Sequence, residues 1–159
     1  DVYKRQEYNE KALEPCTIDG RIYGQPFGVN CTGMFYNKKL LEENGCEVPE
    51  SWEEFQETAA KISNEDVKGF AITALQTEES MYEFLPILWS MGGDVYRIAE
   101  ENSKKAFLLL DQMEKEGSLS LQSISLTMGD LTNQFLKGKI GIMFNSSMAI
   151  DSILSLIHI

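Results

Sequence analysis

Acidic and aromatic side chains that could bind a polar ligand lie between residues 76 and 89 of this 159-residue chain. The carboxylates of Glu78 and Glu79 could accept hydrogen bonds from sugar hydroxyl groups, and Asn30 could add an amide. Tyr82 and Trp89 could pack against the apolar face of a sugar ring. Each also has a plainer interpretation: the glutamates as solvated loop charges, Trp89 as a core residue, and Asn30 as a turn former.

Predicted strands place these residues at the positions where α/β sheets bind ligands. Short apolar runs predict strands over 69–75 and 139–145, and an extended piece over 27–30 ends at Asn30. Ligands of open α/β sheets bind beyond the carboxyl ends of the strands. The segments that follow, Gln76 to Tyr82 and Ser146 to Met148, are therefore the first places to expect a site.

Helical patterns alternate with these strands. A strand over 32–36 leads to Asn37, a good helix N-cap, and the helix from Lys38 stops at Gly45. Ser51 and Glu54 predict a capping box for the helix that follows. Its apolar stripe indicates core packing and consists of Trp52, Phe55, Ala59 and Ile62. The remaining predicted helices cover 7–15, Met81 to Met91 with Pro86 inside, Ser103 to Glu116, and a short segment capped by Asp130 and ended by Gly138. This alternation predicts an α/β architecture with a largely parallel sheet.

Composition excludes several classes of site. A net charge of −11 argues against nucleic-acid binding, because such proteins concentrate Lys and Arg. Cys16, Cys31 and Cys46 form neither a closed disulfide framework nor a metal-binding pair. The only histidine is His158, so the sequence predicts neither zinc binding nor a His-assisted nucleophile, and no cofactor. No apolar run is long enough to span a bilayer, and no signal peptide is recognisable.

Three blocks of the sequence resemble bacterial extracellular solute-binding proteins of ABC importers, in the sugar-binding branch that includes maltose-binding protein. The hinge-crossing segment of that family is similar to IYGQPFGVNCTGMFYNKKLL, in which Asn30 takes a ligand-contacting position. The segment with acidic and aromatic sugar contacts is similar to TEESMYEFLPILWSMGGD, which ends at Asp94. The third block, GDLTNQFLKGKIGIMFNSSMAI, keeps Asn145 but replaces the family's Gly-Pro-Trp with Ser146, Ser147 and Met148. Met148 could still offer an adaptable apolar surface.

The resemblance implies a periplasmic-binding-protein-like type II fold, in which two α/β lobes close on a ligand. It assigns residues 7–30 to the end of lobe one and the first crossing, and residues 31–153 to most of lobe two. Residues 1–6 and 154–159 resemble non-native ends, so the chain is expected to be an internal fragment.

The implied function is to capture a carbohydrate, as an exported monomer that is periplasmic or lipid-anchored, and to deliver it to ABC transporter permease subunits without catalysis. Two alternatives remain: a sugar hydrolase using Glu78 and Glu79 as paired carboxylates, and an α/β interaction module without a ligand.

Overall fold

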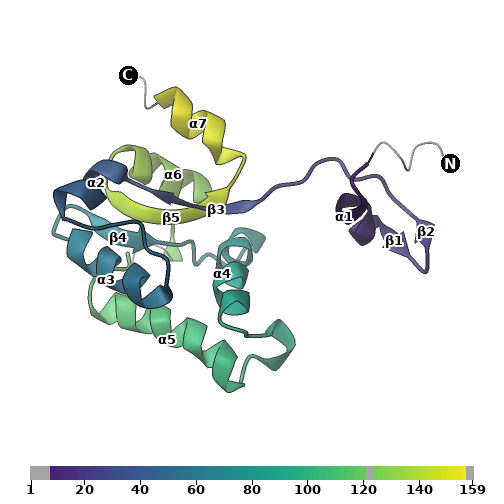
Figure 1. Ribbon diagram of the computed structural model, residues 1–159, viewed down its shortest axis with the longest axis horizontal. Coiled ribbons are helices and arrows are strands. Elements are labelled where there is room, and N and C mark those ends of the chain that lie inside the picture. Colours follow the sequence, from purple (N-terminus) through teal and green to yellow (C-terminus); the bar gives the residue numbers. More distant parts are fainter. Residues whose placement is uncertain (1–7, 121–123, 157–159) are drawn as a thin grey trace. The chain divides into compact units, whose positions relative to one another are not determined.

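The computed structural model describes residues 8–120 and 124–156, and the chain divides into two compact units, Asp1–Cys31 and Thr32–Ile159 (Figure 1). The first unit contains α1 (Glu10–Leu13), a 3-10 helix η2 (Glu14–Cys16) and the small hairpin of β1 (Thr17–Ile18) and β2 (Arg21–Ile22). Residues 23–31 form no helix or strand. The predicted extended piece over 27–30 is therefore not a strand, because no described segment pairs with it.

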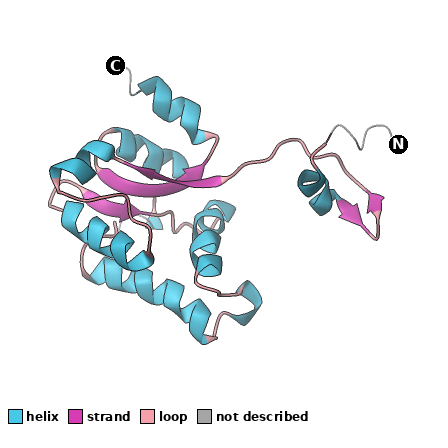
Figure 2. Ribbon diagram, viewed as in Figure 1, coloured by secondary structure: helices cyan, strands magenta, loops and turns pink. Residues whose placement is uncertain are grey.

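The second unit is built on a three-stranded sheet with the order β3-β5-β4 (Figure 2). Strand β4 (Lys68–Ala71) runs parallel to β5 (Ile140–Ser146), whereas β3 (Thr32–Tyr36) is antiparallel to β5. The α/β class is confirmed, but the prediction of a largely parallel sheet is wrong for β3. Its first residue, Thr32, pairs with the last residue of β5, Ser146, so the two strands must run in opposite directions.

Helices cover both faces of this sheet (Figure 1). One face carries α3 (Trp52–Ile62), α4 (Glu78–Ser90) and α5 (Glu101–Lys115), and the other carries α6 (Met128–Leu136) and α7 (Ala149–Leu156). The short helix α2 (Lys38–Glu43) follows β3, and a 3-10 turn, η3 (Val95–Arg97), separates α4 from α5. In the described part of the chain, no helix is long and apolar enough to cross a membrane.

The larger core lies between the sheet and α3. Phe55, Ala59 and Ile62 of the predicted stripe are buried, which confirms its packing role. The ring of Phe55 stacks on Phe144 with centroids 5.8 Å apart. Helix α3 also approaches β4 very closely at Gly69, where a Cβ atom would lie 1.9 Å from the carbonyl oxygen of Ala59. Only glycine fits this position, since real side chains never approach backbone so closely.

Helix boundaries follow the predicted caps with three corrections. Asn37 and Ser51 cap α2 and α3 as predicted, but the Glu54 carboxylate accepts from the Glu50 amide, not from Ser51. Thr127, not Asp130, caps α6, and Asp130 completes a capping box with it. Helix α4 begins at Glu78, three residues earlier than predicted, and continues through Pro86.

Candidate functional site

The carboxyl ends of β4 and β5 lie at one edge of the sheet because the two strands are parallel. From β4, residues 72–77 lead into α4, whose first turn carries Glu78 and Glu79. These carboxylates are therefore on a helix, where acidic groups favour the N-terminus, and not in a loop as predicted. Glu78 is exposed, whereas Glu79 is half-buried and its Oε2 accepts a hydrogen bond of 3.0 Å from the Met128 amide of α6.

Helix α6 connects this turn to the end of β5. The Thr132 hydroxyl donates to the Met128 carbonyl at 2.8 Å and accepts from Asn145 Nδ2, also at 2.8 Å. The Asn145 Oδ1 accepts from the Ser146 amide at 2.7 Å. Asn145 is 3% exposed, so its amide group is already used inside the protein. The structure thus brings two predicted contacts, Glu79 and Asn145, into one hydrogen-bond network.

Tyr82 lies one turn after this acidic pair. Its ring is half-buried, and its hydroxyl group is buried without a hydrogen-bond partner among the described residues. Buried hydroxyl groups almost always have a partner in folded proteins. The Tyr82 hydroxyl therefore has an unused donor and acceptor, which a ligand hydroxyl group or a water molecule could satisfy.

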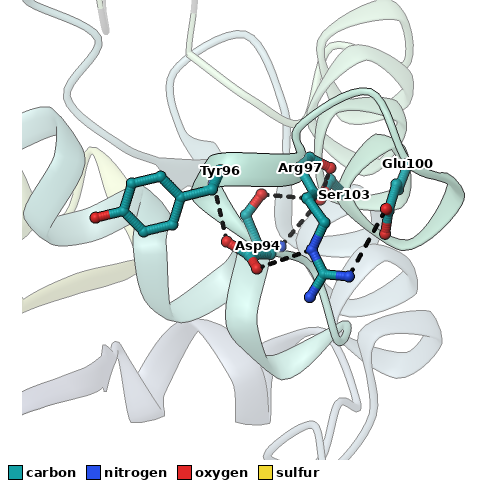
Figure 3. A network of polar contacts seen from close by, with 5 residues as sticks. All are labelled: Asp94, Tyr96, Arg97, Glu100 and Ser103. Atoms are coloured by element: carbon teal, nitrogen blue, oxygen red, sulfur yellow. Dashed lines mark hydrogen bonds and ion pairs between the residues drawn. The ribbon is translucent and has the colours of Figure 1, made fainter.

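Trp89 and Asp94 are not part of this cluster. Trp89 is in the last turn of α4 and is 56% exposed. It is eleven positions after Glu78, which places it about 16 Å further along the helix axis. Asp94 begins η3, where it accepts from the Tyr96 amide and forms an ion pair of 3.2 Å with Arg97 (Figure 3). The hydrogen bond from Tyr96, assisted by Arg97, lowers the pKa of the Asp94 carboxyl group. Its visible role is to hold a turn, since Ser103 of α5 also bonds to its backbone (Figure 3).

The other two predicted contacts are on exposed segments. Asn30 is exposed within residues 23–31 of the first unit. Met148 is 72% exposed in the turn between β5 and α7, where its amide donates to the Ser146 hydroxyl at 3.2 Å. Neither side chain has a described partner that would compete with a ligand.

Sequence reasoning missed Glu83, which is fully buried on α4. Its Oε2 accepts a hydrogen bond of 2.6 Å from the Thr73 amide, and its Oε1 has no partner in the described part of the chain. Burial raises the pKa of Glu83 to about 7, the Thr73 hydrogen bond opposes that rise, and the nearby charge of Glu79 adds to it. An acidic residue inside the apolar run YEFLPILW could have indicated a buried carboxyl group. That interpretation required the correct start of α4, because the start determines which helix face Glu83 lies on.

The cavity on the α3 side of the sheet and the described metal-ligating side chains do not add to the site around Glu78. A cavity of about 310 Å³ opens between α3, α4 and the sheet, lined by apolar groups that include Trp52, Pro86 and Phe144 but none of the predicted contacts. Among residues 8–120 and 124–156, no three His, Cys, Asp or Glu side chains are grouped as a metal site.

Known proteins resemble this chain along most of its length. A family model described as bacterial extracellular solute-binding protein matches residues 1–154. A candidate binding protein of Brucella abortus is 28% identical over 159 residues, covering 92% of this chain and 38% of the relative. The galactooligosaccharide-binding protein of Bacillus subtilis is 27% identical over 96 residues, covering 60% of this chain and 21% of the relative.

The fold agrees with these matches. Maltose-bound MalE3 of T. maritima superposes with a TM-score of 0.81 at 28% identity, over 92% of this chain and 40% of that protein. The chain spans about two fifths of the length of the relatives that match it throughout. Because the family model covers nearly the whole chain, this protein belongs to the bacterial extracellular solute-binding protein family.

Proposed function

We propose that this chain comprises the end of lobe one and most of lobe two of a carbohydrate-binding protein that delivers its ligand to an ABC transporter permease. The observation that carries the proposal is the likeness, in both sequence and fold, to a maltose-bound relative at 28% identity and a TM-score of 0.81. The names of the Bacillus subtilis relative and of a multiple sugar-binding protein from Streptococcus mutans, 30% identical over 59 residues, support the same ligand class.

In this proposal the ligand is held at the carboxyl edge of β4 and β5. Glu78, exposed in the first turn of α4, accepts from sugar hydroxyl groups, and the Tyr82 hydroxyl, which is buried in this structure, bonds to the ligand after the half-buried ring has turned outward. Glu79 and Asn145 act mainly as the frame of the site, since Glu79 Oε2 and both polar atoms of the Asn145 amide have internal partners. Asn30 and Met148 are further proposed contacts, and Trp89 and Asp94 are given no contact.

The proposed mechanism is a population shift between open and closed forms. A ligand that touches both lobes only in the closed form stabilises that form by its differential affinity. One lobe alone offers only part of those contacts. The 159-residue chain is therefore expected to bind sugar much more weakly than the complete protein.

A hydrolytic role is the less favoured alternative. Glycosidases place two carboxyl groups on either side of one bond, roughly 5 Å or more apart and facing each other. Glu78 and Glu79 are adjacent on a helix, so their side chains diverge, and Glu79 is bonded to the Met128 amide. We propose instead that the protein is not an enzyme and that it is exported as a monomer, either free in the periplasm or lipid-anchored at the outer face of the membrane.

The test uses the complete protein, produced after the flanking coding DNA has been recovered. It is titrated with maltose, longer maltooligosaccharides and galactooligosaccharides, while tryptophan fluorescence records binding and chromatography records products. Saturable binding without products is expected. Release of shorter sugars would contradict the proposal, and so would the absence of binding to every sugar in the series. Micromolar binding by the 159-residue chain alone would contradict the two-lobe mechanism.

A further inference from the structure

The loop of residues 72–77 is attached to α4 by hydrogen bonds to two side chains of that helix, Ser80 and Glu83. The Thr73 amide follows the end of β4, so it has no partner in the sheet, and Glu83 Oε2 accepts its hydrogen bond at 2.6 Å. The Thr73 hydroxyl lies 2.9 Å from the Ser80 hydroxyl, and Ser80 donates to the Leu75 carbonyl at 2.6 Å. Two residues of α4 therefore hold both halves of the loop.

Burying the carboxyl group of Glu83 for this contact is unfavourable for the stability of the fold. A fully buried carboxyl group with one unpartnered oxygen costs free energy unless it is protonated or serves a purpose. A hydrophobic residue at this position, one turn before the buried Ile87, would avoid that cost. It would leave the buried Thr73 amide without an acceptor, which is also unfavourable.

We propose that Glu83 is a positioning residue: its buried carboxyl group holds the Thr73 amide and thereby fixes residues 72–77 against α4, the helix whose first turn carries Glu78 and Glu79. The helix carries the clamp and the presented residues on consecutive turns, because Glu79 and Glu83 are four residues apart. The statement that the first turn of α4 presents a ligand contact, Glu78, rests on the proposed function. The clamp itself rests only on the contacts between Glu83 and Thr73.

The charged surroundings of Glu83 are simple. Glu79 is the one charged side chain that acts on its titration in the described structure, and no described ion pair involves Glu83. Helix α5 packs against α4 with Lys104 and Lys105 exposed to solvent, and β3 contains no charged residue. A change in the protonation state of Glu83 should therefore be detected mainly at the Thr73 amide, which donates to its carboxyl group.

The test follows the Thr73 amide in the 159-residue chain by NMR. In the wild-type protein, its chemical shift should titrate with a midpoint of about 7, following the Glu83 carboxyl group. In Glu83→Gln, the side-chain oxygen still accepts the hydrogen bond but does not titrate, so the amide should stay protected and its shift should be independent of pH. In Glu79→Gln, the midpoint should move down, because one like charge has been removed.

Glu83→Leu removes the acceptor without a large change in volume. Hydrogen exchange at Thr73 should become about 10- to 100-fold faster, whereas exchange at Phe70, whose amide donates to the Ser118 carbonyl, should change little. If this variant does not fold, the titrations of wild type, Glu83→Gln and Glu79→Gln still decide. A Thr73 shift that does not titrate in the wild-type protein, or that titrates equally in Glu83→Gln, would overturn the proposal. Absence of sugar binding by the complete wild-type protein would instead contradict the proposed function, since the clamp is measured without ligand.

Discussion

Replacing Glu83 with Gln should change how stability depends on pH by an amount that follows from the structure. Burial raises the pKa of Glu83 from 4.5 to about 7, so between these values the folded protein binds more protons than the unfolded chain. The contribution of Glu83 to stability is therefore highest below about pH 4.5, falls as pH rises through this window, and is level above about pH 7. A shift of this size corresponds to about 3 kcal/mol. Glutamine does not titrate, so the variant should lack this loss.

Urea denaturation of both proteins at a series of pH values from about 4 to about 8 measures the effect. The variant should gain about 3 kcal/mol relative to wild type between the ends of this range, or about 6–12 °C in Tm. Other carboxyl groups titrate in both proteins and cancel in the difference. Glu57→Gln, at an exposed position on α3, is the matched control and should give curves parallel to wild type.

Parallel stability curves for wild type and Glu83→Gln would refute the reasoning. They would mean that the Glu83 carboxyl group titrates alike in the folded and unfolded states, as a solvated side chain does. A variant that is less stable by a constant amount would show only that the new amide group packs poorly, because a packing cost does not depend on pH.

Two further substitutions test the close helix contact and the unpartnered hydroxyl. Gly69→Ala should destabilise the chain by about 3 kcal/mol or more, measured as a lower urea midpoint, because its Cβ would overlap the Ala59 backbone. Tyr82→Phe should leave the urea midpoint unchanged or slightly raised, because it removes a buried hydroxyl without a partner. It should nevertheless weaken sugar binding by the complete protein about 3- to 10-fold in calorimetric titrations.

The controls for these substitutions differ. Gly28→Ala adds a methyl group with no atom within 4 Å and should leave the urea midpoint unchanged. Equal effects of Gly69→Ala and Gly28→Ala would contradict the argument from close packing. A Tyr82→Phe protein that binds every sugar as tightly as wild type would show that this hydroxyl does not contact the ligand.

Local signals in the sequence were sufficient for much of the fold. Strand β3 was predicted with its observed bounds, because Thr32 to Tyr36 is rich in strand formers and Asn37 caps the next helix. The stripe of Phe55, Ala59 and Ile62 repeats at the spacing of a helix that packs on a sheet. Gly138 ends α6 with a φ of 69°, as a glycine after a helix commonly does.

The site was harder to predict, because its contacts join segments that are distant in sequence. Thr77 precedes α4 without a side-chain capping bond, so nothing local marked Glu78 as the start of the helix. With that start misplaced, the i, i+4 relation of Glu79 and Glu83 was not visible. The Met128 amide that donates to the Glu79 carboxylate is 49 residues away in sequence, and only folding brings the two groups together. Residue types therefore indicated the region, but not which polar atoms remain available.

The hydrogen bonds that connect β5 to α4 through α6 are all oriented alike, from donor to acceptor, toward Glu79. The single hydroxyl proton of Thr132 is donated to the Met128 carbonyl, so the Thr132 oxygen must act as the acceptor for Asn145 Nδ2. The remaining polar atom of Asn145, its Oδ1, accepts from the Ser146 amide. The Met128 amide then donates to Glu79, so every donor points toward the carboxylate. This order of donors and acceptors fixes the orientation of the Asn145 amide. An aspartate at position 145 has no proton to donate, so the single Thr132 hydroxyl proton could satisfy either the aspartate or the Met128 carbonyl but not both. An amide therefore suits the end of this strand better than an acid.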